Sequence, residues 1–196
     1  MKKILVCCAL AVLAGCATVV KVEGDQVING RLNVRLTQSW NKLNSYGGQQ
    51  PYETWTLEGA ALDQLRFWAG IQPGQALMTI APGSVPSGQK PPRMPTFTAG
   101  MEPDQLVSLF ELLYSADGSR FTATRVQTAV FAGEPGVRFD FSVVRKRDDL
   151  QLRGTGWVAV RKNELFAMTY VAPELAYWRK LAPKAESVVS TARIKS

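Results

Sequence analysis

The chain has 196 residues, of which 46% are hydrophobic and 20% charged, and its formal net charge is +7. This length suits one domain with its own core, and the modest positive charge is more typical of a solvated basic surface than of a protein that binds anionic headgroups or cell-wall polymers. We expect no nucleic-acid partner. Histidine is missing from the sequence, which excludes Ser-His-Asp and Cys-His catalysis and histidine-ligated metal sites.

The first residues are typical of a secretory leader. Lys2 and Lys3 precede an apolar run from Ile4 to Leu13, and small residues follow. This order is the pattern of a signal peptide. The run is too short to span a bilayer, which takes about 20 apolar residues. We therefore expect this leader to be removed.

The leader ends in Leu13-Ala14-Gly15-Cys16, which resembles the lipobox of bacterial lipoproteins. The resemblance implies cleavage between Gly15 and Cys16, and a diacylglyceryl thioether on Cys16 that anchors the protein to a membrane. Because Ala17 rather than aspartate follows the cysteine, it also implies the periplasmic face of the outer membrane. The alternatives are an ordinary signal peptide with a chance cysteine and a buried N-terminal helix.

The same cleavage limits cysteine chemistry. Cys7 and Cys8 lie in the apolar run and leave with it, so Cys16 is the one cysteine of three that stays. A chain whose single cysteine is lipidated has no disulfide, no free thiol nucleophile and no thiolate metal site. We expect neither a metal nor a cofactor.

After the leader, the sequence predicts a tether, a strand and a hairpin. We expect residues 16–29 to form the tether. Residues 31–36 alternate polar with apolar side chains, the pattern of a strand, whereas residues 39–43 predict a turn or a short helical piece. Residues 53–57 and 62–71 are expected to pair as a hairpin.

Residues 72–100 differ in character from the rest of the chain. Proline recurs among glycine and serine there, at Pro73, Pro82, Pro86, Pro91, Pro92 and Pro95. Proline removes a backbone donor and fixes φ, so long regular structure is not expected. Inserts of this kind are often functional or disordered. We expect a mobile insertion that serves in binding, with one short strand at 77–80.

Two segments carry the pattern of amphipathic helices. Pro103 and Asp104 suit a helix start, and apolar residues then recur at helical spacing, at Leu106, Leu109, Phe110 and Leu113. This helix is expected to end near Asp117-Gly118. A second helix is expected to open at Pro173-Glu174 and to continue past Pro183, with Ala185, Val188 and Ala192 on its inward side.

Between these helices, two-residue periodicity predicts an antiparallel meander. Strands are expected at 122–132, 137–143, 150–160 and 165–171, with turns at 134–136, 147–149 and 162–164. The last strand is apolar on both faces, as in a strand that is covered on both sides. A meander with helices before and after it gives an α+β fold class, with the antiparallel sheet flanked by helices.

Candidate binding residues lie on the meander. Arg145, Lys146 and Arg147 at a predicted turn could contact phosphate or headgroups, although this run is shorter than a polybasic patch of roughly four to eight charges. Trp157 falls on the polar face of its strand, which makes it the best candidate for a covered or functional surface aromatic. Asp148-Asp149 at the same turn is more typical of solvation and edge protection than of acid–base chemistry.

Two short motifs match known catalytic or phosphate sites only in part. Ser39-Trp40-Asn41-Lys42 fits the Ser-x-x-Lys pattern of penicillin-recognising enzymes, but their Ser-Asp-Asn and Lys-Thr-Gly motifs are missing from this sequence. Gly154-Thr155-Gly156 lacks the further residues of a phosphate loop and lies within a strand. Close backbone approach or a bulge explains these glycines better. We therefore assign no catalytic residue.

The order of strand, Trp40, hairpin, helix, meander and closing helix resembles PsbP-like domains over residues 30–194, with Gly154 and Tyr170-Val171-Ala172-Pro173 as further marks. That group includes the extrinsic proteins of photosystem II, Ran-binding nuclear-import proteins and several bacterial lipoproteins. The resemblance implies that residues 30–196 form a single α/β/α sandwich with a binding or assembly role rather than a catalytic one.

These features favour a non-enzymatic, membrane-anchored binding or envelope-assembly module in the periplasm. Its partner is expected to be an envelope protein or the cell wall. Two alternatives stay open: a carboxylate-dependent hydrolase acting on cell-wall glycan, and a lipid carrier with a large apolar cavity. The candidate carboxylates for hydrolysis are Glu53, Glu58, Asp63, Glu111 and Asp140.

Overall fold

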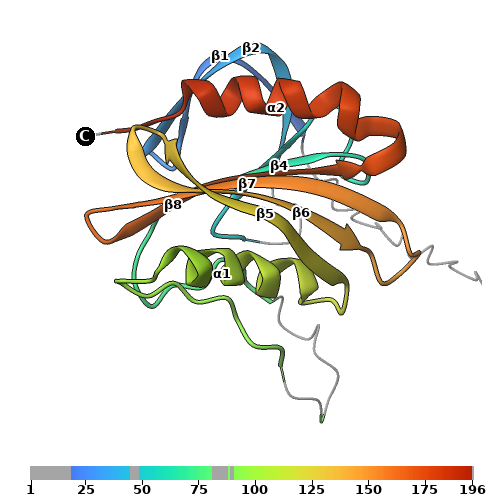
Figure 1. Ribbon diagram of the computed structural model, residues 1–196. Coiled ribbons are helices and arrows are strands. Elements are labelled where there is room, and N and C mark those ends of the chain that lie inside the picture. Colours follow the sequence, from blue (N-terminus) through green and yellow to red (C-terminus); the bar gives the residue numbers. More distant parts are fainter. Residues whose placement is uncertain (1–18, 45–48, 81–87, 89–90, 196) are drawn as a thin grey trace, which may run out of the picture.

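The computed structural model describes residues 19–44, 49–80, 88 and 91–195 (Figure 1). The strands in this part of the chain are β1 (Val19–Ile28), β2 (Leu32–Leu43), β3 (Glu53–Thr56), β4 (Gln64–Ile71), β5 (Arg120–Phe131), β6 (Glu134–Val144), β7 (Gln151–Arg161), β8 (Glu164–Pro173) and β9 (Arg193–Ile194). The helices are α1 (Pro103–Ser115), the short π-helical turn η1 (Glu174–Trp178) and α2 (Arg179–Thr191).

The nine strands found in the described residues form one sheet in the order β1-β2-β3-β4-β8-β7-β6-β5, with β9 paired to β2. Every strand pair is antiparallel. α1 lies on one face of the sheet and α2 on the other (Figure 1). The predicted antiparallel meander and the two helices are confirmed. Within the described ranges, no helix is long and apolar enough to cross a membrane.

The N-terminal hairpin corrects two predictions. Residues 19–28, expected within the tether, form β1 and pair along their length with β2. Residues 39–43, expected as a turn or helical piece, continue β2. The cause is the pair Asn29-Gly30, where both residues adopt positive φ. Asn-Gly favours tight hairpin turns, so the chain reverses where the sequence had suggested only a tether.

The proline-rich segment also differs from the prediction, because its two ends pair with each other. Ala76 and Thr96 form a β-bridge, and the N–H of Leu77 donates to the carbonyl of Pro95. Leu77 and Phe97 are fully buried against α1 and the sheet. The expected strand at 77–80 is replaced by this single bridge. Residues 81–87 and 89–90, also part of the predicted mobile insertion, lie outside the described residues.

The predicted hairpin of residues 53–71 is confirmed as β3 and β4, and the predicted meander as β5 to β8. One turn lies earlier than expected. The chain reverses at Ala132-Gly133, both with positive φ, whereas 134–136 already belongs to β6. Pro135 and Gly136 suggested a turn, but Ala132 and Gly133 both have positive φ, as a type I′ hairpin turn requires, so the chain reverses there.

Gly154 and Gly156 of β7 have a packing role. They permit the close approach that the sequence predicted for these glycines. A Cβ at Gly154 would lie 2.3 Å from the Phe141 ring, and one at Gly156 would lie 2.1 Å from the Phe139 ring. Both rings come from β6, directly opposite in the register. The glycines therefore let aromatic rings of the α1-side core lie flat on the sheet.

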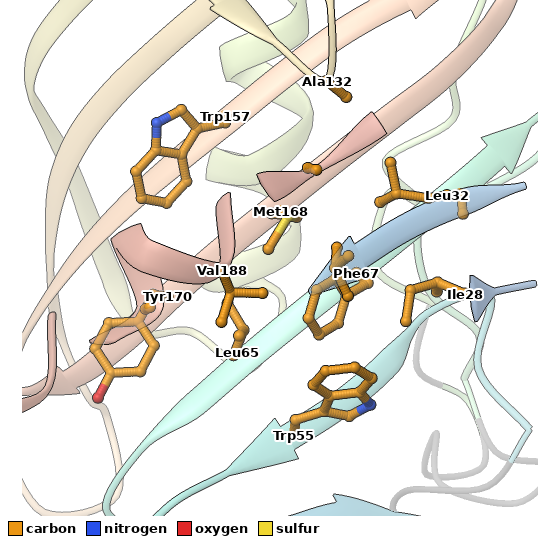
Figure 2. Close-up of a cluster of buried hydrophobic side chains, with 14 of the residues drawn as sticks. Ile28, Leu32, Trp55, Leu65, Phe67, Ala132, Trp157, Met168, Tyr170 and Val188 are labelled. Atoms are coloured by element: carbon orange, nitrogen blue, oxygen red, sulfur yellow. The ribbon is translucent and has the colours of Figure 1, made fainter. Parts of the chain in front are cut away.

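Two hydrophobic clusters share this sheet, one under each helix. The cluster beneath α2 includes Trp55, Phe67, Met168 and Val188, which converge from separate elements (Figure 2). The cluster beneath α1 includes Trp68, Phe110 and the phenylalanines of β6. Since neighbouring residues of one strand point to opposite faces, β4, β7 and β8 supply both clusters. This explains why β8 is buried along nearly its whole length.

Candidate functional site

A cavity of about 280 Å³ opens at one end of the sheet, next to the C-terminal end of α1. Its walls come from the 60–63 loop, the start of β4, the residues after α1, the end of β6, the start of β7 and the end of β8. Hydrophobic, acidic and basic side chains all contribute to it. We name it the Arg66 pocket, after the lining residue whose guanidinium lies over two aromatic rings.

Asp63 builds one wall of the Arg66 pocket. Its side chain is buried, and its carboxylate accepts hydrogen bonds from the Thr56 hydroxyl (2.6 Å) and from the backbone N–H groups of Leu57 (2.8 Å) and Glu58 (2.7 Å). Because these donors satisfy the carboxylate, Asp63 stabilises the connection between β3 and β4. Its charge is committed to the loop rather than to a neighbouring cation.

Arg66 is the only charged residue of β4, a strand otherwise rich in buried apolar side chains. Its guanidinium lies 5.0 Å from the centre of the Tyr52 ring and 5.5 Å from that of Tyr114, so two aromatic faces hold it. One Nη donates to Oε1 of Gln64 at 2.6 Å. Among the described residues, no carboxylate oxygen lies within 4.0 Å of this guanidinium, and its buried Nε has no acceptor.

Tyr114 leaves the charge of Arg66 uncompensated. Burial raises the pKa of the Tyr114 phenol; the positive charge of Arg66 and hydrogen bonds with Thr169 and Arg66 oppose this shift only in part. The phenol oxygen lies 2.6 Å from the hydroxyl of Thr169 on β8, which fixes the ring in place. A neutral phenol can stack on a guanidinium, but it cannot act as its counter-ion. The pocket therefore holds a positive charge that no carboxylate of the described residues pairs with.

The basic run at the β6–β7 turn contributes two of its three residues to the pocket. Arg145 and Arg147 line the pocket. Arg145 donates twice to Asp148, at 2.8 and 2.6 Å, and Arg147 lies 3.5 Å from the same carboxylate. The hydrogen bonds from Arg145 hold the pKa of Asp148 below its usual value. Lys146 instead lies over Gly118, and its backbone N–H donates to the Ser119 hydroxyl.

Trp157 does not belong to this pocket or to an exposed surface. Its side chain is buried at 5% exposure in the cluster beneath α2 (Figure 2). The guanidinium of Arg138 lies 5.5 Å from its ring centre and also pairs with Glu186 of α2 at 2.8 Å. Of the two alternatives for Trp157, a covered or a functional surface aromatic, the structure shows the covered one, because α2 packs over the strand face that carries its polar neighbours. Trp157 therefore does not form the binding surface that the sequence suggested.

The remaining predicted site residues fall into two groups. Gly15 and Cys16 lie outside the described residues, so cleavage and lipidation stay predictions. The carboxylates proposed for hydrolysis are distributed over β3, the 57–63 connection, α1 and β6, where Glu53 pairs with Lys42 and Asp140 with Arg138. In the part of the chain described, no three potential metal-ligating side chains are grouped.

Sequence reasoning missed Arg66, although one signal was present. The segment 64–71 is a strand pattern with apolar residues on both faces and a single charge. A charge in a covered strand is costly unless it is paired or meets a ligand, so its position alone marks it for attention. The stacking of Tyr52 and Tyr114 on it could not be inferred, because the three residues come from separate elements.

One solved structure with the same architecture is the solution structure of cyanobacterial PsbP (CyanoP) from Synechocystis sp. PCC 6803. The two structures superpose with a TM-score of 0.54 over 93% of this chain and 95% of that chain, at 11% sequence identity. No protein-family model matches the sequence, and no curated protein matches it either.

This chain has a PsbP-like fold. At 11% identity the likeness shows how the chain folds and carries no residue of CyanoP over to the Arg66 pocket.

Proposed function

We propose that this protein is a lipid-anchored, non-enzymatic binding module of the bacterial cell envelope. The lipid on Cys16 holds it at the periplasmic face of the outer membrane. The Arg66 pocket receives an anionic group of its partner, which is an envelope protein or a component of the cell wall.

The anchor is supported by Leu13-Ala14-Gly15-Cys16 and the leader before it. Each buried methylene of an acyl chain contributes about 0.8 kcal/mol, and stable anchoring takes more than one chain. A lipidated cysteine with two or three chains meets that requirement. The protein then meets its partners at a membrane surface.

The binding role is carried by one observation: within the described ranges, the guanidinium of Arg66 is held by two aromatic rings and has no carboxylate partner. Proteins seldom place a charge beside a core without a counter-ion, since removing it from water costs free energy. An anionic group of a partner supplies the missing counter-ion. Arg66 is held by aromatic rings before the partner arrives, so little further ordering is needed on binding.

The finer architecture belongs to the same proposal. We assign the domain to the α/β/α sandwich of PsbP-like proteins, with the sheet as its middle layer. The position of α1 and α2 on opposite faces supports this (Figure 1), as does the buried apolar stripe that each helix turns toward the sheet.

The anchor is tested by metabolic labelling with palmitate and membrane fractionation of the tagged protein in a Gram-negative host. The wild type is expected to incorporate label and to sediment with outer membranes. Cys16→Ser removes the thiol that carries the lipid, so its product is expected to stay unlabelled and to leave the membrane fraction. An unlabelled wild type, or a labelled Cys16→Ser, contradicts the anchor.

The binding role is tested by crosslinking in intact cells, followed by purification of the tagged protein. Envelope material captured by the wild type is expected to be lost with Arg66→Gln, which removes the charge but keeps a polar side chain. The matched control is Arg179→Gln, which makes the same change at an exposed position on α2. Equal capture by all three proteins means that the Arg66 pocket does not bind the envelope partner.

A further inference from the structure

The Arg66 pocket combines one available positive charge with an apolar wall, and we infer that its ligand is the free C-terminal carboxylate of a peptide chain. This rests on the proposed binding function and specifies the chemistry of the group that the pocket receives. Five properties of the pocket lead to it: its charge, the geometry of Arg66, the hydroxyl of Ser119, its apolar lining and its size.

The charges that line the pocket favour an anion with a single charge. Arg145 and Arg147 share the carboxylate of Asp148, so Arg66 is the cation of the lining that lacks a carboxylate within 4.0 Å in the described part of the chain. Asp63 and Asp117 also line the pocket and repel a second negative charge. A monoanion therefore fits better than a doubly charged phosphate monoester.

The geometry of Arg66 favours a planar carboxylate. A guanidinium offers five N–H donors in a fixed plane and pairs with a carboxylate through two parallel hydrogen bonds. One Nη of Arg66 serves Gln64, and the stacking of Tyr52 and Tyr114 holds the plane of the group. Arg66 lines the pocket, so a guanidinium whose position is already held by these contacts is available to a carboxylate there.

A further donor lies in the same wall. The buried hydroxyl of Ser119 accepts a hydrogen bond from the N–H of Lys146 at 3.0 Å. Its own hydrogen has no acceptor among the residues that the structure describes. It can be donated to a carbonyl or carboxylate oxygen of a ligand, as the end of a peptide chain provides.

Part of the lining is apolar, and the pocket is small. Val143, Leu152 and Val171 line it beside the charged groups. The volume of about 280 Å³ lies just below the range of roughly 300 to 1,000 Å³ that is usual for drug-sized ligands. It suits one chain-terminal residue with a small apolar side chain better than a sugar polymer or an acyl chain.

The inference is tested by isothermal titration of the full-length lipidated protein, in detergent micelles, with N-acetyl-dialanine and with its C-terminal amide. The two probes differ only in the charged carboxylate. The free acid is expected to bind at least tenfold more tightly than the amide. In Arg66→Gln this preference is expected to disappear, and in Arg179→Gln it is expected to persist. Thermal unfolding of each variant shows whether it is folded.

The comparison of acid with amide on the wild type needs no variant, so a misfolded Arg66→Gln leaves the test intact. Equal affinity of the two probes overturns the inference. Tighter binding of inorganic phosphate, or of vesicles containing phosphatidylglycerol, than of the free acid overturns it as well. If envelope capture depends on Arg66 but acid and amide bind alike, the ligand assignment fails and the proposed function stands. If the free acid is preferred but envelope capture does not depend on Arg66, the ligand assignment stands and the proposed function fails.

Discussion

Tyr170 is a buried side chain whose polar atom is unsatisfied within the part of the chain described. Its hydroxyl has no hydrogen-bond partner there, and Nε1 of the neighbouring Trp40 has none either. The two rings meet edge to face at a centroid distance of 6.4 Å. Both side chains therefore contribute through the apolar bulk of their rings, and the hydroxyl is a cost to folding rather than a contact.

Tyr170→Phe is accordingly expected to leave stability unchanged or to raise it by up to about 1 kcal/mol, because a buried polar group without a partner is destabilising. Urea unfolding measures the difference. The matched control is Tyr114→Phe, which removes a hydroxyl that does have a partner, in Thr169, and which is expected to cost about 1 kcal/mol. A larger loss for Tyr170→Phe than for Tyr114→Phe contradicts this account.

The same residue makes the protein sensitive to alkaline pH. Burial raises the pKa of Tyr170, and the negative charges of Asp63 and Glu58 raise it further. In the unfolded chain a tyrosine ionises near pH 10. Above that pH the unfolded state loses a proton that the folded state keeps, so the free energy of unfolding falls as pH rises. Urea unfolding between pH 8 and about 11 should show a shallower fall for Tyr170→Phe. If the free energy of unfolding falls equally with pH in the two proteins, Tyr170 is not the source of the alkaline sensitivity.

At the scale of single elements, the close contact of β7 with β6 sets a strict size limit. Gly156→Ala places a methyl group where the Phe139 ring now lies, and overpacking of this kind costs about 1–3 kcal/mol. Phe139→Leu removes the ring edge. The double variant is therefore expected to lose less than the sum of the two single losses, as measured in a double-mutant cycle by urea unfolding. Additive losses mean that the ring and the glycine do not interact.

The proline-rich segment contains a structural part at its two ends. Replacing residues 72–100 by a short linker removes Leu77 and Phe97 from the core, and large buried side chains contribute about 2–5 kcal/mol each. Replacing residues 81–90 alone keeps both side chains and is expected to leave the unfolding midpoint nearly unchanged. Thermal unfolding of the two variants separates the cases. Equal midpoints mean that the paired ends do not contribute to the core.

The elements that could be predicted from the sequence are those with strong local patterns. The stripe of α1 and the alternation along β6 each specify one buried face, and the structure keeps both. β1 was missed because its short alternation depends on a turn at Asn29-Gly30 that was given no weight. The sequence could not decide whether Trp157 is covered or exposed, because the element that covers it, α2, is distant in the sequence.

Of the Arg66 pocket, Arg145, Arg147 and Asp63 were candidates from the sequence. The two arginines already have an acidic partner, and the carboxylate of Asp63 is satisfied by donors of its own loop. Arg66 lies about fifty positions from Tyr114 and is brought to it by the pairing of β4 with β8 and by the position of α1. Charge patterns in a sequence mark where cations are. They do not tell which cation the fold leaves without a counter-ion.

For the whole molecule, the shared sheet predicts one cooperative unfolding transition. β8 gives Ala167 to the cluster beneath α1 and Met168 to the cluster beneath α2, so neither cluster can lose its order while the other keeps an intact sheet. Leu109→Ala and Val188→Ala change one cluster each and are both expected to shift the same single transition. Coincident far-UV and near-UV circular dichroism curves check this. Separate transitions for the two variants indicate two independent folding units.

The start of β1 has a consequence for how far the proposed module can reach. Ala17 and Thr18 alone separate Cys16 from Val19, the first residue of β1. Because an extended chain spans roughly 3.5 Å per residue, a lipidated Cys16 can lie at most about 10 Å from Val19. Val19 lies opposite Leu43, Leu43 opposite Thr54, and Thr54 opposite Arg66. Val19 and Arg66 thus share one row of the sheet, with their backbones three strand spacings or roughly 15 Å apart. A protein held this way samples only the thin layer of periplasm next to the bilayer, and acidic chain ends deeper in that compartment must come to it.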